Sequence, residues 1–116
     1  MSATAPVRTA ADLLTSPAPF RAWLMGREPG RPVGATCRTY ACPLAWFLSE
    51  RLGRSVGVTR LGVWAALAPS PVPLCRLPGW AARFASTLDA AALDPGSAVT
   101  AADALAALDR ADGRAR

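Results

Sequence analysis

Prolines and glycines divide this chain of 116 residues into short segments, and that division limits it to short helices and strands. Eleven prolines and nine glycines occur, in runs such as SPAP at 16–19 and REPGRPVG at 27–34. Proline breaks a helix from within, and glycine commonly follows the last helical residue. The apolar surface must therefore be buried by several short elements packed on one another.

Two copies of the sequence TAAD, at 9–12 and 100–103, predict helix N-termini. In each copy the threonine hydroxyl accepts an early backbone N–H and the aspartate reaches back, a variant of the capping box. The acid also complements the positive end of the helix. We expect one short helix from Thr9, ended by the SPAP run, and another from Ala101 to about Ala111.

Three further helices are predicted from apolar residues at helical spacing. Pro17, Pro43 and Pro78 suit the first helical position of each, and Gly26 and Gly53 end the first two. The residues expected to face the core are Phe20, Trp23, Leu24, Leu44, Phe47, Leu48, Leu52, Trp80, Phe84 and Leu88.

Residues 56–58 and 63–67 alternate between apolar and other positions, which predicts a β-hairpin or two short strands. A third strand is expected from residues 35–40, because an isolated hairpin is marginal in water. The proline-rich residues 68–79 predict an extended connector over the surface or the sheet edge. The whole indicates a compact, mostly helical single α+β domain over 1–116, with about five short helices and flexible tails at 1–8 and 112–116.

The composition excludes much chemistry. The chain has no histidine, so the commonest general base and metal ligand is absent. No phosphate-binding loop, dinucleotide fingerprint or nucleophile elbow occurs, and the eight acidic residues are scattered. We therefore expect no enzyme, no cofactor and no metal site.

The sequence also predicts a location. The N-terminus has no apolar run of a secretory signal, and the longest apolar run, 61–68, is too short for a membrane span. Three cysteines, an odd number, then indicate reduced thiols rather than disulfides. A cytoplasmic protein without membrane contact is expected.

Three interpretations of the cysteines remain open. Zinc lacks a fourth ligand, since the pair at 37 and 42 is joined only by Cys75. Alternatively, Cys42 lies at a predicted helix N-cap that favours its thiolate, with Arg38 nearby and Cys37 able to resolve an oxidised form. The third interpretation treats Cys37, Cys42 and Cys75 as small apolar core residues, and we favour it because it needs no absent partner.

Arginines are concentrated between residues 21 and 60, a segment that contains seven arginines and only two glutamates. With exposed aromatic residues such as Trp23, Tyr40 or Trp46 between them, they would suit a nucleic-acid surface. The simpler interpretation is a solvated basic surface with the tryptophans in the core. The candidate binding residues are Arg27, Arg31, Arg38, Arg51, Arg54, Arg60 and Trp46.

The strings CPLAWFL, PGWAARFASTLDA and VTAADALAAL, together with the short strands between the first two, resemble an arrangement in small uncharacterised proteins of bacteria and their phages. The resemblance covers about residues 37–110. It implies a shared fold and carries no activity or functional residues.

These observations predict a non-enzymatic interaction module that binds a protein partner or itself. Four tryptophans are more than a core of this size obviously needs, so some are expected in an exposed apolar patch. The first alternative is nucleic-acid binding through the arginine-rich region. The second alternative is a thiol-based redox or sensor protein centred on Cys42.

Overall fold

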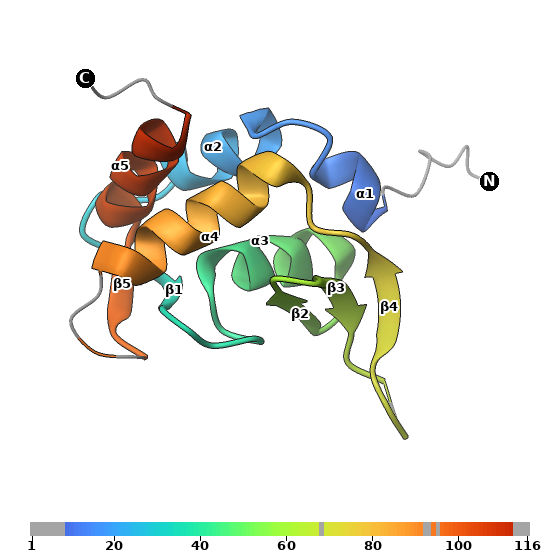
Figure 1. The fold of residues 1–116 in the computed structure, drawn as a ribbon. Coiled ribbons are helices and arrows are strands. Elements are labelled where there is room, and N and C mark those ends of the chain that lie inside the picture. Colours follow the sequence, from blue (N-terminus) through green and yellow to red (C-terminus); the bar gives the residue numbers. More distant parts are fainter. Residues whose placement is uncertain (1–8, 68, 92–93, 95, 113–116) are drawn as a thin grey trace.

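A computed structural model describes residues 9–67, 69–91, 94 and 96–112 of the chain. Its described residues form five helices and two small antiparallel sheets, which confirms the predicted α+β fold (Figure 1). In chain order the elements are α1 (Ala10–Leu13), α2 (Ala18–Met25), β1 (Pro32–Ala35), α3 (Pro43–Leu52), β2 (Val56–Thr59), β3 (Gly62–Ala65), β4 (Val72–Cys75), α4 (Gly79–Ala91), β5 (Ala98–Thr100) and α5 (Ala101–Ala111).

The three-stranded sheet has the order β2-β3-β4, and the predicted hairpin forms its first two strands. The prediction that residues 35–40 supply the third strand is wrong, because that strand is β4. It comes from the segment expected to be a connector, where the alternative of a sheet edge was correct. Proline is tolerated there because an outer strand needs ladder hydrogen bonds on one side only.

A second, two-stranded sheet was not predicted. In it β1 pairs antiparallel with β5, so that Ala35 lies opposite Ala98. The backbone amides of Ala101 and Ala102 continue this tie by donating to Arg31 and Pro29. The start of α5 is thereby fastened to the loop that follows α2.

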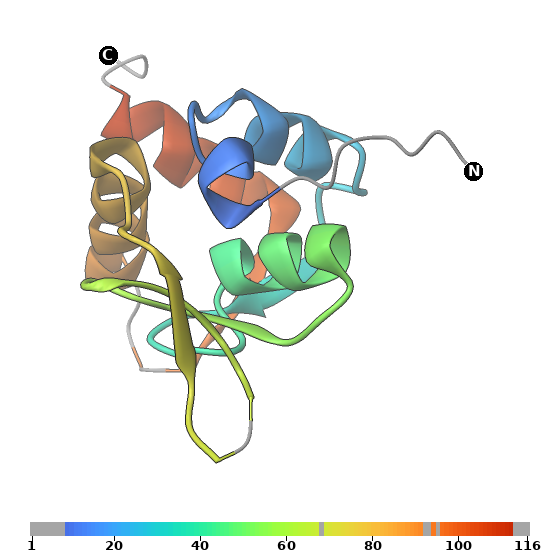
Figure 2. The same ribbon diagram turned by 90° about the vertical axis from the view of Figure 1, so that its right-hand side faces the viewer.

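The helices enclose one core. The α4 and α5 helices lie side by side, and α3 packs between the rest of the helices and strand β2 (Figures 1 and 2). Phe20 is fully buried at its centre, and its ring centroid lies 5.0 Å from that of Phe84 and 5.4 Å from that of Phe47. Of the ten residues predicted to face this core, all but Leu52 are buried, and Leu52 packs against it half-buried.

Local rules account for the helix starts. Both predicted capping boxes are present, at Thr9 with Asp12 and at Thr100 with Asp103. Pro43 begins α3 as predicted, whereas Pro17 is the N-cap of α2 and not its first residue. The αL conformation of Gly53 ends α3.

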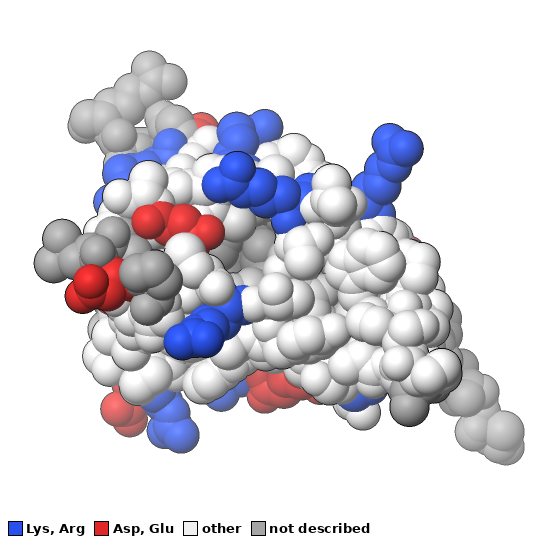
Figure 3. Space-filling model, turned by 60° about the horizontal axis from the view of Figure 1, so that its bottom comes forward, with Lys and Arg blue, Asp and Glu red and all other residues white. Residues whose placement is uncertain are grey.

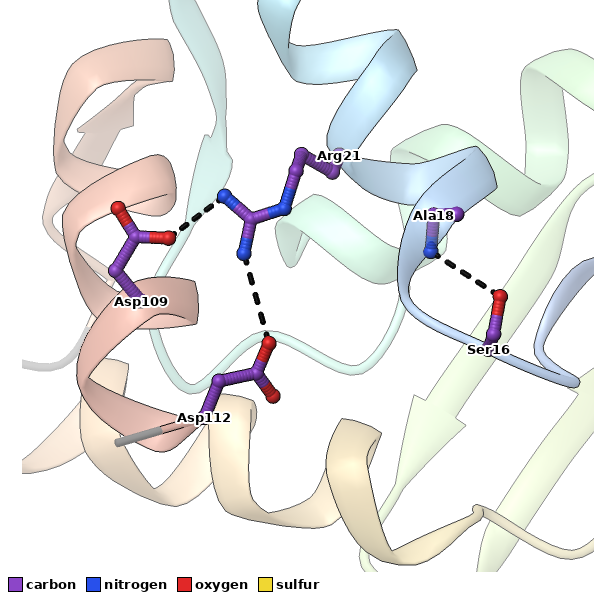
Figure 4. Close-up of polar contacts among 5 residues, drawn as sticks. All are labelled: Ser16, Ala18, Arg21, Asp109 and Asp112. Carbon is purple, nitrogen blue, oxygen red and sulfur yellow. Dashed lines mark hydrogen bonds and ion pairs between the residues drawn. The ribbon is translucent and has the colours of Figure 1, made fainter. Parts of the chain in front are cut away.

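An ion-pair tie joins α2 to α5. Arg21 Nη1 lies 2.6 Å from Asp109 Oδ1, and Arg21 Nη2 lies 3.5 Å from Asp112 Oδ2 (Figure 4). Asp112, predicted to begin a flexible tail, is instead the C-cap of α5. The rest of the predicted tails, 1–8 and 113–116, lie outside the described residues.

One glycine position allows no side chain. Gly34 in β1 has φ +153°, and a Cβ atom there would lie 2.6 Å from the Ala41 carbonyl oxygen and 2.7 Å from the Pro43 nitrogen. The close approach of backbone to backbone places the turn before α3 directly against β1.

Candidate functional site

The predicted arginines do not gather at one site. Of the six candidate arginines, Arg27 and Arg31 line one cavity. Arg38 and Arg60 line a second cavity, and Arg51 and Arg54 lie on the open surface. Figure 3 shows basic groups separated by uncharged surface on the face it presents. The two cavities and an uncharged projection therefore form the three candidate sites.

The first cavity, called the aromatic cavity below, measures about 510 Å³. It opens between α2, the loop after it and α3. The lining residues used below are Trp23, Arg27, Arg31, Tyr40, Trp46 and Glu50. It brings together three of the predicted candidates, Arg27, Arg31 and Trp46.

One wall of the aromatic cavity is a closed polar network. The indole N–H of Trp23 and the guanidinium of Arg27 both donate to the same oxygen of Glu50. The Arg27 guanidinium also lies over the Trp23 ring, 4.7 Å from its centroid. The hydrogen bond from Trp23 and then that from Arg27 hold the pKa of Glu50 below its ordinary value. The carboxylate is thus charged and already occupied by two donors.

The same cavity also presents aromatic surface to solvent. Tyr40 and Trp46 are each 43% exposed, whereas Trp23, predicted as an exposed aromatic, is buried. Gly57 of β2 seats the tyrosine, since a Cβ atom there would lie 2.7 Å from Tyr40 Cε1. Arg31 has no ionic partner among the described residues, and its backbone is fixed by hydrogen bonds at both its N–H and its carbonyl.

The second cavity, called the thiol cavity, measures about 200 Å³ and is lined by both Cys37 and Cys42. Arg38, Arg60 and Asp89 also line it. All three cysteines of the chain are free thiols.

The thiols do not have the character predicted for Cys42. That residue is the N-cap of α3, as expected, but burial raises the pKa of its thiol despite hydrogen bonds from the first turn. Loss of hydration, followed by the charge of Asp89, raises the pKa of the Cys37 thiol. The helix end acts on the Cys42 thiol in the predicted direction, but desolvation outweighs it, so the net pKa is raised and not lowered.

The interpretation of the cysteines as core residues is correct only in part. Cys42 and Cys75 are half-buried and pack against the core. Cys37 is exposed and has φ +57°, and its N–H donates to Asp89 Oδ1 at 3.3 Å. The described residues contain no group of three or more Cys, Asp or Glu placed to hold a metal ion.

The third candidate is a projection called the arm, whose described residues are 62–67 and 69–75 and which contains β3 and β4. It extends away from the body of the molecule (Figure 2). No charged residue occurs from 61 to 75, and the side of the molecule on which the arm lies is largely uncharged (Figure 3). Its large exposed apolar side chains are Leu67 (48% exposed), Val72 (44%) and Leu74 (37%).

The arm was missed as a candidate site. Its signal in the sequence is the charge-free run between Arg60 and Arg76, which is long for a chain that is 18% charged. Prolines within the run indicated a connector and concealed the pairing of β3 with β4, although both strands lie inside the run.

Membrane-spanning helices and similarity to known proteins were two further sources of information on function. Within the described part of the chain, no helix is both long and apolar enough to cross a membrane. The sequence matches no family model, and no curated protein or solved structure matches it. The resemblance to small bacterial and phage proteins therefore stays a prediction.

Proposed function

We propose that this protein is a non-enzymatic interaction module that binds a protein partner through the arm. The observation that carries the proposal is that three apolar side chains, Leu67, Val72 and Leu74, are exposed on one projecting, charge-free hairpin. Exposed apolar surface of this kind costs free energy in water and is typical of interaction sites. A projection can also enter a groove that a flat surface cannot.

The edge of the arm favours contacts through side chains. β4 is an outer strand, and Pro73 at its middle has no N–H to offer to an added strand. Open-ended strand pairing between copies is therefore disfavoured. A net charge of +5 further opposes self-association, so we favour a different protein with an apolar groove over a second copy.

The test replaces two arm residues with charges, as Leu67→Glu with Val72→Glu. The matched control is Met25→Glu, because Met25 is an apolar residue 68% exposed on α2, outside the arm. Capture from the source cell should retain a partner with the native chain and the control and lose it with the double variant. Light scattering after size exclusion identifies self-association.

Two outcomes contradict the proposal. One is a strict monomer that retains no partner, and the other is a partner retained equally by the double variant. Circular dichroism of each variant shows that the fold is unchanged.

The proposal takes the cytoplasm as the compartment, which the three free thiols support. The thiol alternative is not favoured, because the pKa values of Cys37 and Cys42 are raised and little thiolate forms at neutral pH.

A further inference from the structure

The aromatic cavity has the size and composition of a site for a small ligand. Its volume of about 510 Å³ lies within the range of roughly 300–1,000 Å³ that ligand clefts occupy. No residue of the arm lines the aromatic cavity, so ligand binding in the cavity does not depend on the proposed function of the arm.

The charges of the cavity select an anionic group. The lining contains two guanidinium groups, of Arg27 and Arg31, and one carboxylate, of Glu50, so it has one positive charge in excess. Glu50 already accepts hydrogen bonds from Trp23 and Arg27, and its charge is offset by the Arg27 guanidinium. Although aromatic side chains can also enclose an ammonium group, two guanidinium groups in the same cavity would repel it.

Of the two arginines that line the aromatic cavity, Arg31 is the one without an ion pair to a described residue. Its fixed backbone holds the start of its side chain in place. A guanidinium presents paired N–H donors that match a phosphate or a carboxylate.

The exposed rings select a flat group. Trp46 on α3 and Tyr40, seated on Gly57, line the cavity and are each 43% exposed. Bases stack on such rings with little dependence on their identity. The contacts among Trp23, Glu50 and Arg27 hold another part of the lining in place, and such preorganisation lowers the entropy lost on binding.

We propose that the aromatic cavity binds a nucleotide unit, with the base against Trp46 and Tyr40 and the phosphate on Arg31. The unit is either a free nucleotide or an unpaired nucleotide of a single strand. Both sources share this chemistry, and the experiment separates them.

The full chain is titrated with a mononucleotide, the matching nucleoside and inorganic phosphate by calorimetry, and with a labelled single-stranded oligonucleotide by fluorescence anisotropy. The nucleotide or the oligonucleotide should bind, and the nucleoside and phosphate should each bind more weakly. Binding of the mononucleotide identifies a free nucleotide as sufficient, and binding of the oligonucleotide alone identifies a strand.

Three variants locate the site. Trp46→Leu removes the ring but keeps apolar volume, and Arg31→Gln removes the charge; each should weaken binding at least about fivefold. Arg54→Gln is the control, because Arg54 is an exposed arginine that lines neither cavity, and it should change affinity less than about twofold.

Any of three results overturns the inference: no binding of either nucleotide form at millimolar concentration, inorganic phosphate binding as tightly as the nucleotide, or Arg54→Gln weakening binding as much as Arg31→Gln. The last would show diffuse attraction to a basic surface rather than a site. Arg31 and Trp46 are both exposed, so their replacement should leave the fold intact, and circular dichroism checks this for each variant.

Discussion

Truncation of Phe20 should remove the contact that joins three helices. Its ring is fully buried on α2. The ring centroid lies 6.1 Å from that of Trp23 on the same helix and 5.4 Å from that of Phe47 on α3. On α4 it lies 6.1 Å from the Trp80 ring and 5.0 Å from the Phe84 ring. A Phe→Ala change in a core costs about 3–5 kcal/mol, from lost transfer free energy and from the cavity left behind. Phe20→Ala should fall in the upper half of that range, at about 4–5 kcal/mol, since its ring neighbours relax little into the cavity.

The assay is urea unfolding followed by circular dichroism. A chain of this size is stable by about 6–17 kcal/mol, so the variant should fold with a much lower midpoint and an unchanged slope. Trp46→Ala is the matched control, because it truncates an aromatic residue that is 43% exposed, and it should cost less than about 1 kcal/mol. A cost below about 1 kcal/mol for Phe20→Ala, or equal costs for the two, would refute this account of the core.

Three further predictions follow from backbone, charge and thiol chemistry. Gly34→Ala should cost about 1–3 kcal/mol in urea unfolding, given the positive φ and the lack of space, whereas Gly30→Ala, with open space around it, should change stability little; equal effects would contradict this. The folded-state pKa of Glu50 is lowered, so its charge stabilises the fold above the unfolded pKa of about 4.3, and the stabilisation is lost as the pH falls through the folded pKa. Glu50→Gln should therefore reduce stability at neutral pH, by less than about 1 kcal/mol because the group is exposed, and the difference should shrink in acid. Loss of hydration and then Asp89 raise the pKa of Cys37, so its alkylation at neutral pH should be slower than that of an unfolded peptide cysteine and should quicken in Asp89→Asn. A rate unaffected by Asp89→Asn would show that the Asp89 charge does not contribute.

The elements governed by neighbouring residues could be predicted from the sequence. Thr9 and Thr100 mark helix starts because their partners lie three residues away, and Pro43 marks another because it has no N–H to bond. The apolar spacing of the helices also predicted nine of the 23 core residues that the structure describes, including the three phenylalanines.

What depends on distant contacts could not be predicted. The pairing of β1 with β5 joins residues more than sixty positions apart, and neither strand has a strong pattern of its own. β4 was hidden by its prolines. The grouping of Arg31 with Tyr40 and Trp46 follows from how α3 packs, which no local pattern encodes.

The pKa of the Cys42 thiol also depends on contacts that only the folded chain makes. Position at a helix N-terminus predicts a lowered pKa for Cys42, and the helix end does act in that direction. Burial acts the opposite way and is larger, and its extent is known only once the chain is folded.

Photocrosslinking tests the central claim, that the arm is the surface by which this protein binds its partner. A photoreactive amino acid is placed at Leu67 on the arm or at Met25 on α2, both exposed, and the source cell is irradiated. We predict a discrete crosslinked product from position 67 that is absent from position 25. No product from position 67, or the same product from both, would contradict the account.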